Sequence, residues 1–72
     1  MKRLTELREK FGLSQIDLAR EIGVNRQLIS NWEAGKSYPN VFNAIKLANI
    51  FKCSVAYLMG MEGYNDKQKA GQ

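Results

Sequence analysis

Residues 13–36 read LSQIDLAREIGVNRQLISNWEAGK, which is the pattern of two short helices joined by a tight turn. Ser14 is a favourable N-cap, and Asp17 three residues later completes a capping box, so the first helix is expected to begin here. Gly23 ends that helix, because glycine adopts the left-handed backbone conformation at little steric cost. Asn25 is then the expected N-cap of the second helix. The spacing therefore predicts a helix-turn-helix unit.

The second helix, expected over residues 26–34, has two different faces. At about 100° per residue, Ile29 and Trp32 fall on one side, which we expect to be buried. The opposite side is almost uncharged and has no bulky side chains. It carries Gln27, Ser30, Asn31 and Ala34. An ordinary solvent-facing helix would more often carry Glu and Lys. Amide side chains can form paired hydrogen bonds with an adenine edge in the major groove, and arginine can do so with guanine.

Short motifs recur through this unit, and one further run follows it. They are Leu13-Ser14-Gln15, Leu18-Ala19, Ile22-Gly23-Val24, Ile29-Ser30-x-Trp32-Glu33-x-Gly35 and Pro39-x-Val41-x-x-Ala44-Ile45-x-Leu47-Ala48. With these motifs the chain resembles the XRE family, the Cro-and-repressor type of helix-turn-helix protein, from about residue 4 to residue 59. The resemblance implies an all-α fold: a five-helix, lambda-repressor-like DNA-binding domain.

The resemblance also implies a role for individual residues. Five side chains of the second motif helix would contact bases: Arg26, Gln27, Leu28, Ser30 and Asn31. Three residues would contact the phosphate backbone: Gln15, Lys36 and Asn40. A structural ion pair would join Arg8 on the first helix to Glu33. Gln15 would also brace the helix that contacts the bases.

Two residues depart from the family pattern. Ala34 replaces a residue that is often polar in the family, which removes one potential contact with DNA. Lys52 stands where relatives commonly have the glycine that ends the fourth helix, so it is expected to adopt the left-handed conformation at some cost. Cys53 occupies an apolar position of the family and is interpreted as a buried, inert thiol.

Several large apolar residues exceed what the helical patterns place in one core, and a contiguous exposed patch of this kind would indicate a partner. They are Leu28, Tyr38, Phe42, Ile50 and Tyr57. Trp32 is instead assigned to the core, because it shares the inner face with Ile29. The pattern places the remaining helices at residues 2–10, 41–51 and 55–59. The helix-turn-helix domain is expected to span residues 1–60, and a flexible tail residues 61–72.

Composition limits the other classes of function. The chain has 72 residues, a net charge of +4, no histidine and one cysteine. Without a thiol-imidazole pair, a cluster of metal ligands or a phosphate-binding glycine loop, we expect no enzyme, no metal, no cofactor and no small-molecule ligand. The apolar runs are too short for a signal peptide or a membrane span, which favours a cytoplasmic protein.

Two functions of different classes fit these patterns. The first is a transcriptional regulator, in which two copies place their reading helices in major-groove half-sites about 34 Å apart on an operator. A regulator of a toxin-antitoxin or restriction operon would use the same mechanism. The alternative is an antirepressor, which would bind a repressor protein and cover its DNA-reading surface; the modest charge, Ala34 and Leu28 keep this alternative open.

Overall fold

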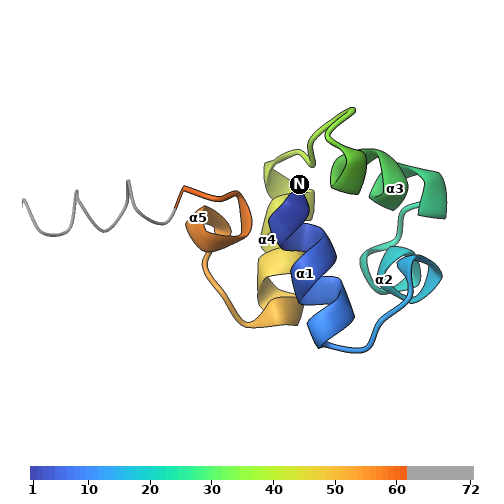
Figure 1. Ribbon diagram of the computed structural model, residues 1–72, viewed down its shortest axis with the longest axis horizontal. Helices are drawn as coiled ribbons and strands as arrows, with labels where there is room; N and C mark the ends of the chain where they lie inside the picture. Colours follow the sequence, from blue (N-terminus) through green and yellow to red (C-terminus); the bar gives the residue numbers. More distant parts are fainter. Residues whose placement is uncertain (62–72) are drawn as a thin grey trace, which may run out of the picture.

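The computed structural model describes residues 1–61, and the regular structure among them is entirely helical (Figure 1). The helices are α1 (Lys2–Lys10), α2 (Gln15–Ile22), α3 (Arg26–Ala34), α4 (Val41–Phe51) and α5 (Val55–Leu58). The predicted five-helix fold class is confirmed. Helix α5 ends one residue earlier than predicted, because Met59 is its C-cap. Of the predicted tail, only Met61 lies within the described residues.

Side-chain caps explain where most of the helices begin. Ser14 Oγ accepts a hydrogen bond from the Asp17 backbone N–H at 3.0 Å, and the Ser14 backbone N–H donates to Asp17 Oδ2 at 3.1 Å. These two bonds are the predicted capping box at the start of α2. The hydrogen bond from the Ser14 backbone lowers the pKa of Asp17. Asn25, Asn40 and Ser54 cap α3, α4 and α5, each with a side-chain oxygen that accepts one backbone N–H.

Left-handed residues end three of the helices. Gly23 and Gly35 follow α2 and α3 with φ of 79° at both positions. Lys52 follows α4 with φ of 55°, and it is the only residue other than glycine with a positive φ among those described. The prediction for Lys52 is confirmed. A side chain in this conformation costs roughly 1–2 kcal/mol, so α4 ends at some expense of stability.

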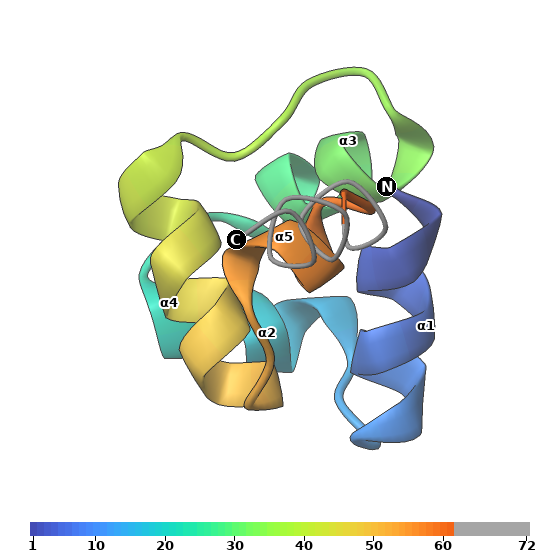
Figure 2. The same ribbon diagram turned by 90° about the vertical axis from the view of Figure 1, so that its left-hand side faces the viewer.

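All five helices contribute to a single core. Figure 2 shows α1 and α4 on opposite sides of the molecule, with the other helices between them. The largest fully buried side chains are Leu4, Leu18, Ile29, Trp32, Leu47 and Leu58. The prediction that Trp32 belongs to the core is therefore confirmed. No helix in residues 1–61 is both long and apolar enough to cross a bilayer.

The expected surplus of apolar residues divides into two groups. Leu28, Ile50 and Tyr57 are partly buried and pack against the core. Tyr38 and Phe42 are exposed. Cys53 is half-buried, not buried as predicted, because it follows α4 at the edge of the core. Burial still raises the pKa of the Cys53 thiol, against a smaller opposing effect of Arg3.

Candidate nucleic-acid interface

The outward face of α3 presents a linked pair of amides. Gln27 Nε2 donates to Asn31 Oδ1 at 3.1 Å, as the spacing of four residues on a helix allows. The bond engages the Gln27 amino group and the Asn31 carbonyl. The Gln27 carbonyl and the Asn31 amino group therefore keep their capacity for a base edge. Ser30, one turn from Gln27, is half-exposed on the same helix.

The remaining predicted base-contacting residues are placed less uniformly. Arg26 is exposed at the first turn of α3. Leu28 is half-buried and packs against the core, so only part of its side chain is available to a ligand. The structure thus brings Arg26, Gln27, Ser30 and Asn31 to the accessible side of one helix and turns Leu28 partly away from it. Their contacts with bases stay predictions.

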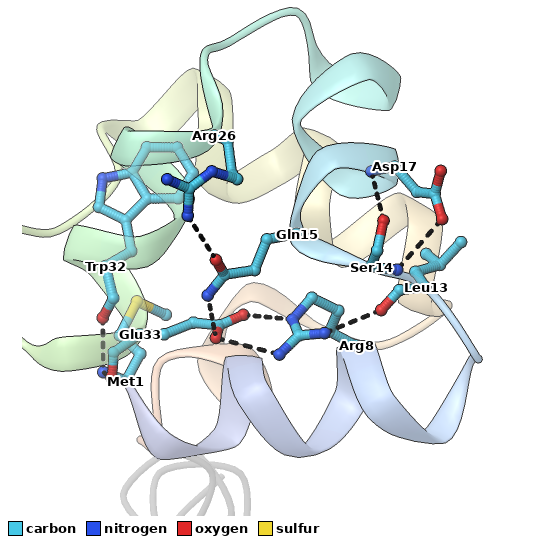
Figure 3. A network of polar contacts seen from close by, with 9 residues as sticks. All are labelled: Met1, Arg8, Leu13, Ser14, Gln15, Asp17, Arg26, Trp32 and Glu33. Atoms are coloured by element: carbon cyan, nitrogen blue, oxygen red, sulfur yellow. Dashed lines mark hydrogen bonds and ion pairs between the residues drawn. The ribbon is translucent and has the colours of Figure 1, made fainter.

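An ion pair holds the inner side of α3 against α1 (Figure 3). Arg8 Nε donates to Glu33 Oε2 at 2.6 Å, and Arg8 Nη2 donates to Glu33 Oε1 at 3.3 Å. The ion pair is therefore bidentate. Arg8 Nη1 also donates to the Leu13 carbonyl at 2.9 Å, which fixes the turn before α2. The two side chains are only 14% and 8% exposed. The sequence-predicted pair is therefore present in the structure and largely removed from solvent.

Hydrogen bonding in this pair controls the charge of both groups. The hydrogen bond to Glu33 raises the pKa of Arg8 above its ordinary value, against the opposing effect of burial. Burial alone would raise the pKa of Glu33. The hydrogen bonds from Arg8 and Gln15 outweigh it and leave the pKa of Glu33 lowered. Both side chains therefore stay charged at neutral pH.

Gln15 connects this ion pair to the start of α3. Its Nε2 donates to Glu33 Oε1 at 3.0 Å, and its Oε1 accepts from Arg26 Nη1 at 3.3 Å. Figure 3 shows the resulting line of side chains, in which Arg8, Glu33, Gln15 and Arg26 follow one another. The amide of Gln15 thus braces α3 from α2. Its contact with a phosphate stays a prediction.

The loop after α3 carries the other predicted phosphate contacts. Lys36 is exposed directly after the Gly35 cap. Asn40 is exposed at the start of α4, where its Oδ1 accepts from the Asn43 backbone N–H at 2.8 Å. This cap leaves the Asn40 amino group as a donor at a helix N-terminus, a place that favours anions. Lys36 and Asn40 therefore lie on one loop, but no bond between them is formed.

Sequence reasoning missed two groups of residues outside α3. The Arg3 guanidinium lies 4.0 Å from the centre of the Tyr57 ring, and Arg3 Nη1 donates to the Tyr57 carbonyl at 3.0 Å. No local pattern signals a contact between residues 54 positions apart. Val41 and Ile45 are exposed, although they match the apolar pattern of the fourth helix. On a helical plot Val41 falls only about 20° from the buried Ala48, so the pattern gives no sign that Val41 is exposed.

Comparison with known proteins agrees with this geometry. A family model described as helix-turn-helix matches residues 4–58. The HTH-type transcriptional regulator ImmR of Bacillus subtilis is 31% identical over 68 residues, which are 94% of this chain and 54% of that protein. Repressor protein C2 of Salmonella phage P22 is 33% identical over 58 residues, which are 81% of this chain and 27% of that protein. This chain thus spans about half the length of ImmR and about a quarter of C2.

A solved structure extends the likeness to three dimensions. The structure is that of the P22 c2 repressor protein in complex with synthetic operator 9T, and it matches with a TM-score of 0.76 and 33% identity. The match covers 79% of this chain and 86% of that chain. From the matched family model, the relatives and the shared arrangement of helices, we conclude that this chain belongs to the XRE type of the helix-turn-helix family.

Proposed function

We propose that this protein is a sequence-specific DNA-binding transcriptional regulator that reads the major groove with α3. The observation that carries the proposal is the outward amide pair of Gln27 and Asn31, joined at 3.1 Å on a helix whose other side is clamped to the core. A solved protein of the same fold is bound to an operator. Two oriented amides on a rigid helix suit recognition of base edges in the major groove.

Each group at the interface would have a separate task. Arg26, Gln27, Ser30 and Asn31 would contact base edges, with a smaller apolar contribution from Leu28. Gln15, Lys36 and Asn40 would contact phosphates and set the register of α3. Phosphate contacts themselves carry no sequence information. Regulation would follow from occupancy of the operator. The relatives named as a transcriptional regulator and as a repressor protein favour this function over the antirepressor alternative.

The assembly is part of the same proposal. Two copies would bind a two-fold symmetric operator, with the half-site centres about one helical turn, or 34 Å, apart. A protein that acts on DNA in this way needs neither catalysis nor a cofactor, and its expected location is the cytoplasm. The sign of regulation would depend on where the operator lies relative to the promoter.

Selection from a random DNA library tests the proposal. The wild-type protein should enrich one sequence over repeated rounds, and a mobility shift should show affinity for that sequence that falls steeply as salt rises. The matched control is the double variant Gln27→Ala with Asn31→Ala, whose helical content is checked by circular dichroism. This variant should enrich no sequence. A wild-type protein that enriches none either would overturn the proposal.

A further inference from the structure

The amino group of Met1 lies against the end of α3. The Met1 ammonium donates to the Trp32 carbonyl at 2.6 Å and to the Glu33 carbonyl at 3.0 Å. Both bonds are partly buried, and Figure 3 shows the bond to Trp32 beside the ion pair of Arg8 with Glu33. Figure 2 marks the N-terminus next to α3. The fold therefore joins Met1 to α3, although 31 positions separate it from Trp32.

The end of α3 needs donors from outside the helix. The last carbonyls of a helix have no partner within it. The backbone N–H groups of Gly35 and Lys36 donate to the Asn31 and Trp32 carbonyls, as expected at a left-handed glycine cap. No other hydrogen bond among the described residues reaches the Glu33 carbonyl. The ammonium therefore completes the cap at the end of α3.

Charge explains why an ammonium suits this place. The C-terminal end of a helix carries a partial negative charge, which a cation stabilises, and the N-terminal end carries a partial positive charge. The last turn of α3 has no basic residue, and the first turn of α1 has no acidic one. The ammonium supplies the cation that the end of α3 lacks. The end of α3 in turn offsets the unfavourable position of this cation at the start of α1.

The ammonium and the ion pair hold α3 at two separate places on α1. Arg8 binds the carboxylate of Glu33, whereas Met1 binds its backbone carbonyl. At a rise of 1.5 Å per residue, Met1 and Arg8 stand about 10 Å apart along the axis of α1. Two attachments at this separation resist rotation of α3 on α1. Asn31 directly precedes the attached residues, so the ammonium supports the turn that presents this amide.

We propose that the Met1 ammonium positions the last turn of α3 for DNA, and that an acyl group on this nitrogen loosens that turn. The effect on DNA rests on the proposed function. Acylation, whether by a formyl group, an acetyl group or a preceding residue, makes the nitrogen an amide with one N–H and no charge. It therefore removes the charge and at least one of the two hydrogen bonds. Asn31 and Lys36 would then lose part of their support.

Chemical synthesis of the 72-residue chain allows this nitrogen alone to be changed. The free amine is compared with an Nα-acetyl form and with a desamino form, which has hydrogen in place of the amino group. Both should lower the midpoint of thermal unfolding by about 4–8 °C. The amides of Gly35 and Lys36 should exchange with solvent faster, relative to those of Gly23 and Val24 at the end of α2.

An Nα-methyl form is the matched control. It keeps the charge and two N–H groups and adds bulk at the same nitrogen, so it should resemble the free amine in stability and exchange. A desamino form that unfolds and exchanges like the free amine would overturn the inference. A loss in the Nα-methyl form as large as that in the acetyl form would also contradict it, because bulk would then be responsible instead of charge.

Binding to the selected DNA tests the functional part. The acetyl and desamino forms should bind about fivefold more weakly, because fewer molecules hold α3 in the binding position. The slope of log affinity against log salt should stay that of the free amine, since the ammonium faces helix carbonyls and not phosphate. Unchanged stability with a shallower slope would place the ammonium on DNA and refute the inference. If no form binds DNA, the proposed function fails, and thermal unfolding and exchange still decide whether the ammonium caps α3.

Discussion

Helices α3 and α4 are built by the same rules but meet different surroundings. Each begins at an asparagine N-cap, Asn25 or Asn40, and each ends at a left-handed residue, Gly35 or Lys52. Each also buries one apolar face in the common core. Their outward faces differ, because α3 presents amides and a hydroxyl, whereas α4 presents exposed apolar side chains beside the polar Lys46 and Asn49.

This comparison separates what the fold requires from what it leaves free. The inner faces must fill one core, so their residues are restricted in size and polarity. The outer faces contribute little to the core, so their chemistry reflects the partner. Uncharged amides on the outer face of α3 suit base edges. Five substitutions test this separation, from the largest expected effect to the smallest.

Removing the main inner anchor of α3 should have the largest effect. Trp32→Ala should lower the free energy of unfolding by about 3–5 kcal/mol, because it leaves a large cavity in a small core. Urea denaturation followed by circular dichroism measures this loss. If the variant does not fold, Trp32→Phe gives a smaller loss in the same direction. Phe42→Gln on the outer face of α4 is the matched control and should stay within about 0.5 kcal/mol of wild type.

Glu33→Gln tests the ion pair between α1 and α3. It should lower the free energy of unfolding by about 2 kcal/mol at neutral pH, because Arg8 loses its charged partner in a poorly solvated site. The lowered pKa of Glu33 means that wild type gains stability from this carboxylate above the unfolded pKa of about 4.3. That gain disappears as the pH falls through the lower, folded pKa. Unfolding curves of both proteins should therefore converge on the acid side. A constant gap from pH 7 to pH 3 would show that ionisation of Glu33 is not involved.

Asn31→Ala tests the outer face of α3. The variant should lose about 1–2 kcal/mol of binding free energy on the selected DNA sequence and little on random DNA, because an amide contact with a base edge distinguishes sequences. A quantitative mobility shift on both DNAs measures the difference, and the stability of the free protein should hardly change. Equal losses on the two DNAs would show that Asn31 does not distinguish one DNA sequence from another.

Lys36→Ala tests the loop between the two helices. A phosphate contact should contribute to every sequence alike, so the variant should bind all DNAs more weakly. The slope of log affinity against log salt should decrease in magnitude by about one. Lys10→Ala, at the far end of α1, removes the same charge away from the interface and serves as the control. A slope equal to that of wild type would place Lys36 outside the contact.

The smallest effect concerns the ends of the two helices. Lys52→Gly should make the protein about 0.5–1 kcal/mol more stable, because glycine relieves the left-handed conformation after α4 but adds freedom to the unfolded chain. Thermal unfolding measures the gain. The reverse change after α3, Gly35→Lys, should destabilise the protein by a similar amount. A loss of stability in Lys52→Gly would show that the lysine stem contributes packing that outweighs the strain.

Local chemistry explains why much of the fold was predictable. Caps such as Ser14, Asn25 and Asn40 act within three residues, so their effect can be read directly from the sequence. The left-handed Lys52 and the pair of Arg8 with Glu33 depended instead on the resemblance to the family. The ion pair joins residues on different helices, so no local spacing specifies it.

Other features of the site depend on the tertiary structure and could not be predicted from the sequence. Gln15 donates to Glu33 and accepts from Arg26, and both bonds depend on how three helix ends converge. The degree of burial of Leu28 and Cys53 depends on neighbours far away in sequence. Val41 and Ile45 illustrate the same difficulty, since an apolar residue on an apolar helix gives no local sign of which side it faces.

The two faces of α3 also have a consequence for how such a protein changes over generations. Gln27, Ser30 and Asn31 lie outside the core, so mutations at these three positions leave the packing of Ile29 and Trp32 intact. Under the proposed function, a lineage can therefore change from one operator to another without passing through unfolded intermediates. The ion pair and the Gln15 amide, which hold the helix in place, are the part that such divergence must preserve.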